Sequence, residues 1–281
     1  MSQTPPVVLT IAGFDPSSGA GVTADIKTIA AHGCYGVAAI TALTVQSTGG
    51  VRRVAPVDPG LLIDTLKELT ADISISATHI GMLGSGDVAL RLAGFLERAR
   101  LPNVVLDPIL KSSSGASLLD KSAWRVLKER ILPLASIVTP NVSEAAALTE
   151  ISITGEGDMQ AAACRLHQLG ARAVVITGGD LPEAVDFLSI SGQYAQFFRS
   201  PHLASTHTHG TGCAFATAIA CHLAHGSDLS AAVLLAKSYV AAAIAGAYPV
   251  GQGPGPVNHM EKVRSSARAS GGTEGQASGK G

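Results

Sequence analysis

Apolar runs of strand length alternate along the chain with stretches of helical periodicity. The strand-like runs cover residues 7–12, 36–44, 54–57, 78–82, 103–106, 136–139 and 173–177. Helical patterns cover residues 20–31, a stretch that begins at 58–59, and residues 86–100, 119–131, 142–149 and 157–169. Repeated strand–helix units of this kind predict an α/β protein, in which a mainly parallel sheet carries helices on both faces.

The last third of the chain departs from this alternation. Residues 185–190 and 194–199 are strand-like and are joined by Ser-Gly-Gln, which predicts a hairpin at one edge of the sheet. Two long, alanine-rich helices are expected over about 211–225 and 228–247. Residues 263–281 are rich in Ser and Gly and lack a core-forming pattern. We therefore expect one domain over 1–262 and a disordered tail over 263–281.

Composition narrows the class of protein. Hydrophobic residues make up 46% and charged residues 15% of the 281 residues, which indicates a globular protein with a large core. The net charge of −1 and the 4% aromatic content favour neither nucleic acid nor a membrane as partner. The four cysteines form no C-x-x-C pair, and the first residues do not resemble a signal peptide. A cytoplasmic protein with reduced thiols and without a zinc site is expected.

The most informative segment is Thr-His-Thr-His-Gly-Thr-Gly-Cys at 206–213, which leads directly into an apolar helix. Backbone N–H groups and the dipole at a helix N-terminus attract negative charge, and they suit a transferring phosphoryl group. The same field favours the thiolate of Cys213, which would then accept a proton from a substrate hydroxyl. Taken alone, such a segment is as often only a tight turn, a helix cap and a small core residue.

Other polar or glycine-rich positions follow predicted strands. The loop 13–21 follows the first strand, where small ligands bind in open α/β sheets, and Gln46 follows the second. Gln46 offers both a donor and an acceptor to the edge of a heterocycle. Gly178 and Gly179 would let the backbone approach a phosphate closely. Each of these features is also typical of ordinary turns and polar surface. The chain has neither a P-loop nor a G-x-G-x-x-G motif.

Asn141 and Glu144 stand three residues apart, between a predicted strand and a predicted helix. This is the spacing of a capping box, in which the two residues satisfy each other's backbone N–H groups. A functional interpretation is that Glu144 orders water around Mg²⁺ while Asn141 faces phosphate, because Mg²⁺ favours carboxylates, waters and phosphates. The two interpretations are compatible.

Taken in order, the motifs resemble the ribokinase-like superfamily and, within it, the hydroxymethylpyrimidine/phosphomethylpyrimidine kinase family of thiamine biosynthesis. The matching segments are 10–28, 40–49, 80–83, 106–108, 139–145, 207–213 and 253–259. The resemblance implies a three-layer α/β/α sandwich. It also implies phosphoryl transfer from ATP, assisted by Mg²⁺, to a small aminopyrimidine alcohol and then to its monophosphate. We further expect a homodimer.

The resemblance also implies roles for individual residues. Cys213 is the base. Most ribokinase-like kinases have an aspartate at this position, and a cysteine there resembles the pyrimidine kinase branch. The proposed contacts of the remaining groups are as follows: backbone N–H groups of Gly210, Thr211 and Gly212 to the phosphoryl group; Gln46 to the pyrimidine edge; Gly13, Ala20, Asp25 and Met82 to the substrate pocket; Asn141, Gly178 and Gly179 to ATP; and Glu144 to Mg²⁺.

One position departs from the family pattern. Thr177 stands where the family usually has a lysine, so a positive charge near the ATP phosphates is absent there. Lys111, in the loop after Pro108, is the candidate replacement. Two alternatives remain open: a pyridoxal kinase, which would share the fold and parts of the pocket, and a non-catalytic relative, which would keep the pocket and lose the chemistry. Thr177 favours the second alternative, and the intact Gly-Thr-Gly-Cys turn disfavours it.

Overall fold

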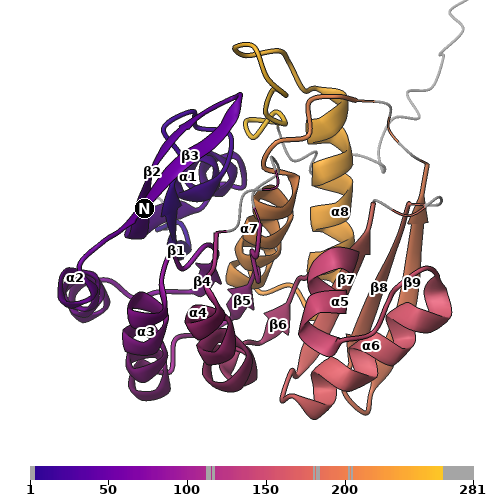
Figure 1. Ribbon diagram of the computed structural model, residues 1–281, viewed down its shortest axis with the longest axis horizontal. Helices are drawn as coiled ribbons and strands as arrows, with labels where there is room; N and C mark the ends of the chain where they lie inside the picture. Colours follow the sequence, from indigo (N-terminus) through magenta and orange to yellow (C-terminus); the bar gives the residue numbers. More distant parts are fainter. Residues whose placement is uncertain are drawn as a thin grey trace, which may run out of the picture.

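Nine strands form one sheet in the order β3-β2-β1-β4-β5-β6-β7-β8-β9 (Figure 1). The computed structural model describes residues 4–111, 115, 118–179, 181, 184–201, 203 and 205–261. The strands are β1 Val7–Phe14, β2 Tyr35–Ser47, β3 Gly50–Pro56, β4 Ala77–Ile80, β5 Val104–Leu106, β6 Ile137–Val138, β7 Ala173–Gly178, β8 Ala184–Ile190 and β9 Tyr194–Ser200. The tail predicted over 263–281 lies outside the described residues.

The centre of the sheet is parallel and its two edges are antiparallel. Strand β1 pairs in parallel with β2 and β4, and the strands from β4 to β7 continue the parallel pairing. The predicted hairpin is confirmed as β8–β9, which pairs Ile190 with Tyr194. A second hairpin, β2–β3, was not predicted, because the sequence pattern gave a short isolated strand at 54–57.

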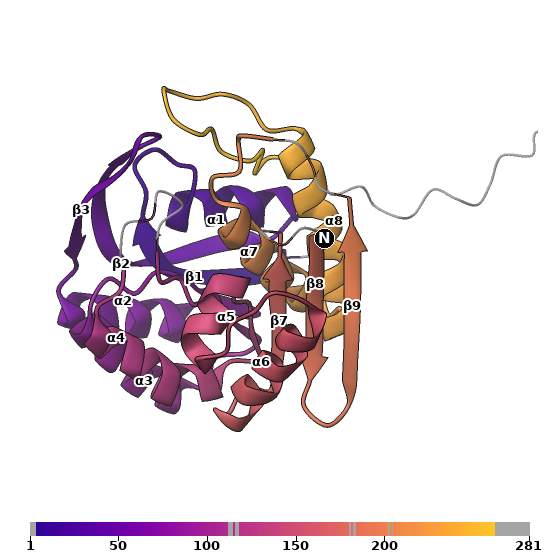
Figure 2. The ribbon, with the colours of Figure 1, turned by 45° about the vertical axis from the view of Figure 1, so that its right-hand side comes forward.

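Helices cover both faces of this sheet (Figures 1 and 2). One face carries α1 Gly21–Ala31, α7 Thr211–Ala224 and α8 Leu229–Ala245, and the other carries α2 Pro59–Asp72, α3 Gly86–Ala99, α4 Lys121–Val126, α5 Val142–Thr149 and α6 Glu156–Gln168. Each face has its own buried apolar cluster, one joining α2–α6 to the sheet and one joining α1, α7 and α8 to it. The predicted three-layer fold is confirmed.

The helix predicted over 119–131 is interrupted. Regular α-helix ends at Val126, a π-helical turn follows over Leu127–Ile131, and a 3₁₀ turn covers Leu132–Leu134. Pro133 lies in that last turn, and a proline cannot donate the backbone hydrogen bond that would continue an α-helix. The apolar periodicity of the sequence marks the buried face correctly but does not show this change of pitch.

Most helix N-termini are capped by a side chain. Asp58, Ser85, Asp120, Asn141 and Asp228 each accept a hydrogen bond from the backbone N–H three residues ahead. Helices α1, α6 and α7 have no such cap. The first turns of α1 and α7 therefore present backbone N–H groups that no capping side chain satisfies, and these two ends flank the site described below.

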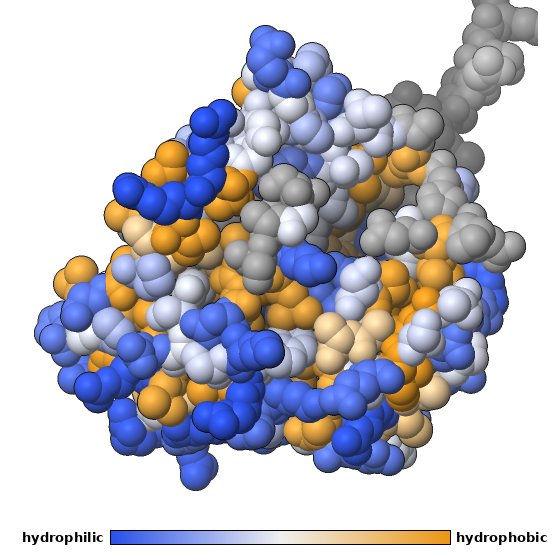
Figure 3. All heavy atoms as spheres, viewed as in Figure 1, coloured by the Kyte–Doolittle hydropathy of each residue, from blue (hydrophilic) through white to orange (hydrophobic). Residues whose placement is uncertain are grey.

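The β2–β3 hairpin leaves apolar side chains on the surface. Ala42 of β2 packs inward with Met82 and Leu118, and Val51 and Val54 of β3 pack against them. The alternate positions Leu43 and Val45 are 49% and 48% exposed, and Figure 3 shows apolar surface over this hairpin. Among the described residues, no helix is both long and apolar enough to cross a membrane.

Candidate active site

The loop after β1 folds around the carboxylate of Asp15. One carboxylate oxygen accepts hydrogen bonds from the backbone N–H and the hydroxyl of Ser17, at 2.8 and 2.6 Å. The other accepts from the backbone N–H groups of Gly19 and Ala20, at 3.2 and 3.0 Å. Burial alone would raise the pKa of Asp15, but hydrogen bonds from His209 and Ser17 hold that pKa below its ordinary value. The loop is therefore built on a stable negative charge.

His209 connects this loop to the segment before α7. Its Nε2 lies 3.0 Å from Asp15 Oδ2 and 3.5 Å from Nε2 of Gln46, whose Oε1 accepts a hydrogen bond from Thr44. Since the Asp15 carboxylate can only accept, His209 Nε2 is the donor in that contact. Gln46, which was predicted to hydrogen-bond to the pyrimidine edge, is half-buried and lies beside the first loop, at the carboxyl end of β2.

The other predicted substrate residues meet at the same end of the sheet. Gly13 lies against Met82, because a Cβ atom on Gly13 would approach Met82 Sδ to 2.8 Å. Ala20 occupies the cap position of α1. The structure thus brings Gly13, Ala20, Gln46 and Met82 together around the carboxyl ends of β1, β2 and β4, where parallel sheets bind ligands.

Asp25 lies deeper than predicted. Its side chain is fully buried, and its carboxylate accepts hydrogen bonds from the hydroxyls of Thr10 and Thr217, at 2.6 and 2.9 Å. His79 Nδ1 lies 3.2 Å from Asp25 Oδ2. Burial alone would lower the pKa of His79, but the Asp25 charge raises it above the ordinary value. Asp25 therefore belongs to a buried ion pair behind the site, and its carboxylate does not line an open pocket.

The turn that carries Cys213 requires glycine at its first position. Gly210 has a φ of +83°, and a Cβ atom there would lie 1.9 Å from the carbonyl oxygen of Gly19. A C-terminal strap braces the same turn, because His209 N–H donates to Gly255 O and Val257 N–H donates to His209 O, at 3.2 and 3.1 Å. The turn is thus held against the first loop by backbone contacts on both sides.

Cys213 lies between two helix N-termini. Its side chain is 7% exposed, and Sγ accepts a hydrogen bond from the backbone N–H of Gly21, at the start of α1. Burial and the nearby carboxylates of Asp107 and Asp25 nevertheless raise the pKa of the thiol well above 9. The prediction that the helix field makes Cys213 a thiolate is therefore wrong, because desolvation and negative neighbours outweigh the two helix ends.

Asp107 is a site residue that the sequence reasoning did not single out. It follows β5 and is 4% exposed, and it is hydrogen-bonded to Cys213. Burial raises the pKa of Asp107 to about 7, while the positive charge of His79 opposes the rise. The signal available in the sequence was an acidic residue between a buried strand and Pro108, a place where an unpaired carboxylate is costly.

The residues predicted to serve ATP lie along the next strands. Asn141 and Glu144 form the expected capping box, with reciprocal hydrogen bonds of 3.0 and 2.9 Å. Asn141 also lies beside Thr177, whose N–H donates to Pro140 O. Gly178 N–H donates to the carboxylate of Asp186, at 3.1 Å.

The two glycines of this segment differ in their surroundings. A Cβ atom on Gly178 would meet the carbonyl oxygen of Val185, whereas a Cβ atom on Gly179 would meet nothing within 4 Å. Close packing against β8 therefore explains why a glycine is needed at position 178. Gly179 is the glycine that leaves room for a ligand. Lys111 is exposed on the loop after β5.

A bound magnesium ion would find one buried carboxylate on the nucleotide side. Among the described residues, no three His, Cys, Asp or Glu side chains are grouped to hold a metal ion. Glu144 is 8% exposed, and its charge is close enough to Cys213 to affect the thiol. Mg²⁺ commonly binds through one or two carboxylates together with waters and substrate phosphates, so this donor set fits an ion that arrives with the nucleotide.

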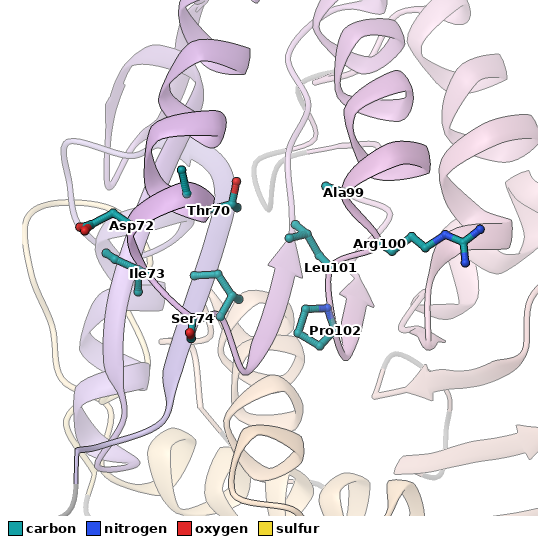
Figure 4. A pocket seen from close by; sticks show the side chains of 10 residues that line it. Thr70, Asp72, Ile73, Ser74, Ala99, Arg100, Leu101 and Pro102 are labelled. Carbon is teal, nitrogen blue, oxygen red and sulfur yellow. The ribbon is translucent and has the colours of Figure 1, made fainter.

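A hollow on the surface lies elsewhere. Figure 4 shows it between the ends of α2 and α3 and the starts of β4 and β5, with a volume of about 330 Å³. Thr70, Asp72, Arg100 and Pro102 are among its lining residues. Since β4 and β5 begin there, the hollow is at the opposite end of the sheet from Cys213, and we do not assign the chemistry to it.

Comparison with known proteins agrees with this geometry. A family profile described as phosphomethylpyrimidine kinase matches residues 15–258. The hydroxymethylpyrimidine/phosphomethylpyrimidine kinase of Streptomyces coelicolor is 40% identical over 257 residues, which cover 91% of this chain and 95% of that protein. The thiamine biosynthesis bifunctional protein ThiED of Geobacter sulfurreducens is 46% identical over 255 residues. That alignment covers 90% of this chain and 52% of ThiED, so the chain spans about half of the bifunctional protein.

A solved structure shows the same fold. The Bacillus subtilis pyridoxal kinase, in an ADP complex, superposes with a TM-score of 0.83 at 34% identity, covering 91% of this chain and 97% of that one. The phosphomethylpyrimidine kinase of Clostridium difficile superposes with a TM-score of 0.76 at 35% identity, covering 84% of this chain and 98% of that one. Relatives named for pyrimidine and for pyridoxal phosphorylation thus share this ribokinase-like architecture. Fold alone does not separate the two substrates.

Proposed function

This chain belongs to the phosphomethylpyrimidine kinase family, a family of phosphotransferases, and from that premise we propose its substrates and site. It transfers a phosphoryl group from ATP to the hydroxymethyl group of 4-amino-5-hydroxymethyl-2-methylpyrimidine, and then a second one to the monophosphate, in thiamine biosynthesis. The observation that carries this proposal is the position of Cys213, on a turn braced against the first loop and between the first turns of α1 and α7.

We assign the transferring phosphoryl group to the N-terminus of α7. Backbone N–H groups of Gly210, Thr211 and Gly212 face it, and the helix dipole favours its negative charge. Thr211 N–H donates to Thr208 O in the structure, at 3.2 Å, and exchanges this partner for a phosphoryl oxygen when substrate binds. Such positioning and charge stabilisation supply most of the catalysis in phosphoryl transfer.

Cys213 accepts the proton of the substrate hydroxyl, and Gln46 reads the ring. Gly13, Ala20 and Met82 line the remainder of the pyrimidine pocket, while Asp25 holds the pocket from behind through Thr10, His79 and Thr217. An amide that donates and accepts at once matches an amino group beside a ring nitrogen. Pyridoxal offers a phenolic oxygen and an aldehyde there instead.

On the nucleotide side we place ATP against Asn141, Gly179 and the backbone of Gly178, with Lys111 as the candidate cation. Glu144 would hold Mg²⁺ through water, and the ion, when bound, neutralises phosphate charge. Free cysteines throughout the chain support a cytoplasmic location.

Steady-state kinetics with two alcohols test this function. The wild-type protein is expected to phosphorylate the aminopyrimidine alcohol with a higher kcat/KM than pyridoxal, because a site built for polar edges rejects analogues that leave its groups unpaired. Gln46→Ala should raise KM for the pyrimidine and narrow the preference. Equal kcat/KM values in the wild type, or an undiminished preference in the variant, would move the assignment to pyridoxal kinase. A chain that binds the pyrimidine and transfers no phosphoryl group would be the non-catalytic relative.

We also propose a homodimer that buries the outer face of the β2–β3 hairpin. Leu43 and Val45 lie on β2, next to the edge strand β3, and leave about half of their surface exposed. A second copy of the same face would cover them. Sedimentation of the wild type and of Leu43→Asp tests this. We expect the wild type to sediment as a dimer and Leu43→Asp to shift towards the monomer. A monomeric wild type would refute the proposal.

A further inference from the structure

A chain of buried titratable groups lies directly beneath Cys213. Asp25 and His79 form an ion pair in which neither side chain is exposed, and His79 interacts electrostatically with Asp107. Asp107 in turn is hydrogen-bonded to Cys213. His79 Nε2 is buried and has no hydrogen-bond partner. Four groups from β4, α1, α7 and the end of β5 therefore share one water-poor space.

The position of Asp107 is specific with respect to the catalytic turn. A Cβ atom on Gly212 would lie 3.8 Å from Asp107 Oδ2, so the carboxylate lies against the first turn of α7, where the transferring phosphoryl group is placed. A permanent negative charge there would repel the phosphate. A carboxylate that becomes protonated during the reaction would not.

Because Cys213 is protonated, it needs a neighbouring group that can accept the thiol proton. Its pKa is raised well above 9, so the side chain is a neutral thiol at neutral pH and has no lone negative charge with which to accept a proton. A base must lose its own proton before or while it takes another. Asp107 is the group placed to receive it.

We propose that Asp107 takes the proton of the Cys213 thiol as Cys213 takes the proton of the substrate hydroxyl, and that the charges of the nearby His79–Asp25 pair act on the Asp107 carboxylate in this step. The inference deepens the function proposed above and rests on it. Asp107 and His79 are positioning residues, because they act through Cys213 and do not touch the substrate.

The step balances. The substrate oxygen forms its bond to the γ-phosphorus of ATP while the bond from that phosphorus to the bridging oxygen breaks, and ADP leaves with the electron pair. The hydroxyl proton goes to Cys213 Sγ, and the original thiol proton goes to Asp107. Cys213 ends as a thiol and Asp107 as a neutral carboxylic acid, which releases its proton to solvent before the next cycle.

The pH dependence of kcat separates this role from a structural one. The groups that face Asp107 are His79 from β4, Asp25 from α1 and Cys213 from α7, and Glu144 of α5 also acts on the thiol. Because the acceptor must be unprotonated, wild-type kcat should rise with pH through about 7 and then level off.

The decisive variant is Asp107→Asn, which keeps the size of the side chain and cannot take a proton. At pH 7 its kcat should fall by roughly 10²-fold, in the range of general acid–base catalysis, while KM changes little. The fall should shrink towards high pH, where the thiol begins to ionise without a partner. Cys213→Ala should show a similar loss with no recovery at high pH, and Asp64→Asn, a surface carboxylate, should match the wild type.

Alkylation of Cys213 by iodoacetamide, followed by mass spectrometry of its peptide, supplies a second readout. Removal of the Asp107 charge should lower the thiol pKa and speed alkylation in Asp107→Asn. The proposal expects faster alkylation together with slower turnover. If Asp107 merely suppresses the thiolate, both rates will rise, and the proposal fails. A rise of kcat through pH 7 that survives in Asp107→Asn also overturns it.

Two further arms keep the test decisive. If Asp107→Asn does not give a native melting transition, His79→Gln takes its place. This variant removes the positive charge that lowers the pKa of Asp107 and leaves the Asp25 charge that raises it. The rise of kcat should therefore move to higher pH. An unmoved profile refutes the role of the pair. The wild-type assay alone tests the substrate; should only pyridoxal be phosphorylated, the proposed function fails and the same variants are compared on that alcohol.

Discussion

Gly210→Ala tests whether backbone contact with the first loop holds the turn that precedes Cys213. Gly210 has a φ of +83°, and an added Cβ would lie 1.9 Å from Gly19 O, far inside any normal contact. Gly226 provides a matched control, because its φ is +87° and a Cβ there would meet nothing within 4 Å. Both substitutions impose the left-handed backbone on alanine, and only one imposes the clash.

The magnitudes follow from this difference. The left-handed conformation costs an L-residue about 1–2 kcal/mol, and stiffening of the unfolded chain returns about 0.4–1 kcal/mol of it. Gly226→Ala should therefore destabilise the protein by about 1 kcal/mol. Relief of the clash at Gly210 requires a backbone shift, which adds about 1–3 kcal/mol, as overpacking does elsewhere. About 2–4 °C of melting temperature accompanies each kcal/mol in a domain of this size. The melting temperature should thus fall by roughly 2–4 °C in Gly226→Ala and by roughly 4–16 °C in Gly210→Ala.

Activity gives the second half of this test. Gly210→Ala should lower kcat by at least about tenfold even well below its melting temperature, because displacements of about 1 Å at a reacting group can cost 10²-fold. Gly226→Ala should keep wild-type kcat. Thermal denaturation and steady-state assays at 20 °C below each midpoint measure both quantities. Equal losses of melting temperature, or a fully active Gly210→Ala, would refute the reasoning that the turn depends on its contact with Gly19.

Two further predictions concern the nucleotide side and the pH dependence of stability. Thr177→Lys should lower KM for ATP, because a charged donor near phosphate is favourable. Lys111→Ala should raise KM for ATP, and adding Thr177→Lys to that variant should lower KM again. Unchanged KM values would show that neither side chain reaches the phosphates. Burial lowers the pKa of His222 to about 4, from an unfolded value of 6.5, so unfolding binds a proton between these values. The stability that neutral His222 contributes is fully present above pH 6.5 and is lost as pH falls towards 4. Melting temperatures measured in citrate–phosphate buffers across this range should fall less steeply for His222→Gln than for the wild type. Parallel curves of melting temperature against pH would contradict this.

The sequence predicted the parts of the fold that rest on periodicity and on chain order. Alternating strands and helices gave the parallel centre of the sheet, and the short Ser-Gly-Gln connection gave the β8–β9 hairpin. The β2–β3 hairpin escaped because β2 runs on to Ser47 through Thr44 and Gln46, polar residues that interrupt the apolar pattern. Edge strands with one open face carry less apolar signal than buried ones.

The sequence predicted where the candidate residues gather, and it did not predict the electrostatics of the place. The motifs placed Gln46, Asn141 and Cys213 at strand and helix ends, and connectivity alone brings such ends to one edge of the sheet. The ionisation of Cys213 depends instead on Asp107 and Asp25, which stand 106 and 188 residues away in the chain. The N–H groups at a helix N-terminus follow from the local sequence, whereas these carboxylates come close to the thiol only in the tertiary fold.

The missing side-chain caps of α1 and α7 bear on the chemistry proposed at Cys213. Alanine at position 20 is a poor cap, and replacing a good cap by alanine typically costs about 1 kcal/mol. A Ser or Asp at that position would satisfy the first N–H groups of α1 from within, as Asp58 and Asp228 do for α2 and α8. At the site, Gly21 N–H instead donates to the thiol of Cys213. The protein thus gives up local stability at the two helix ends that flank Cys213, and it keeps self-satisfied ends at five helices elsewhere in the described structure. Helix α6, which begins after Gly155, also lacks a side-chain cap, so a missing cap alone does not mark a site. Two uncapped helix ends that meet around one thiol are what we expect of a binding or catalytic site.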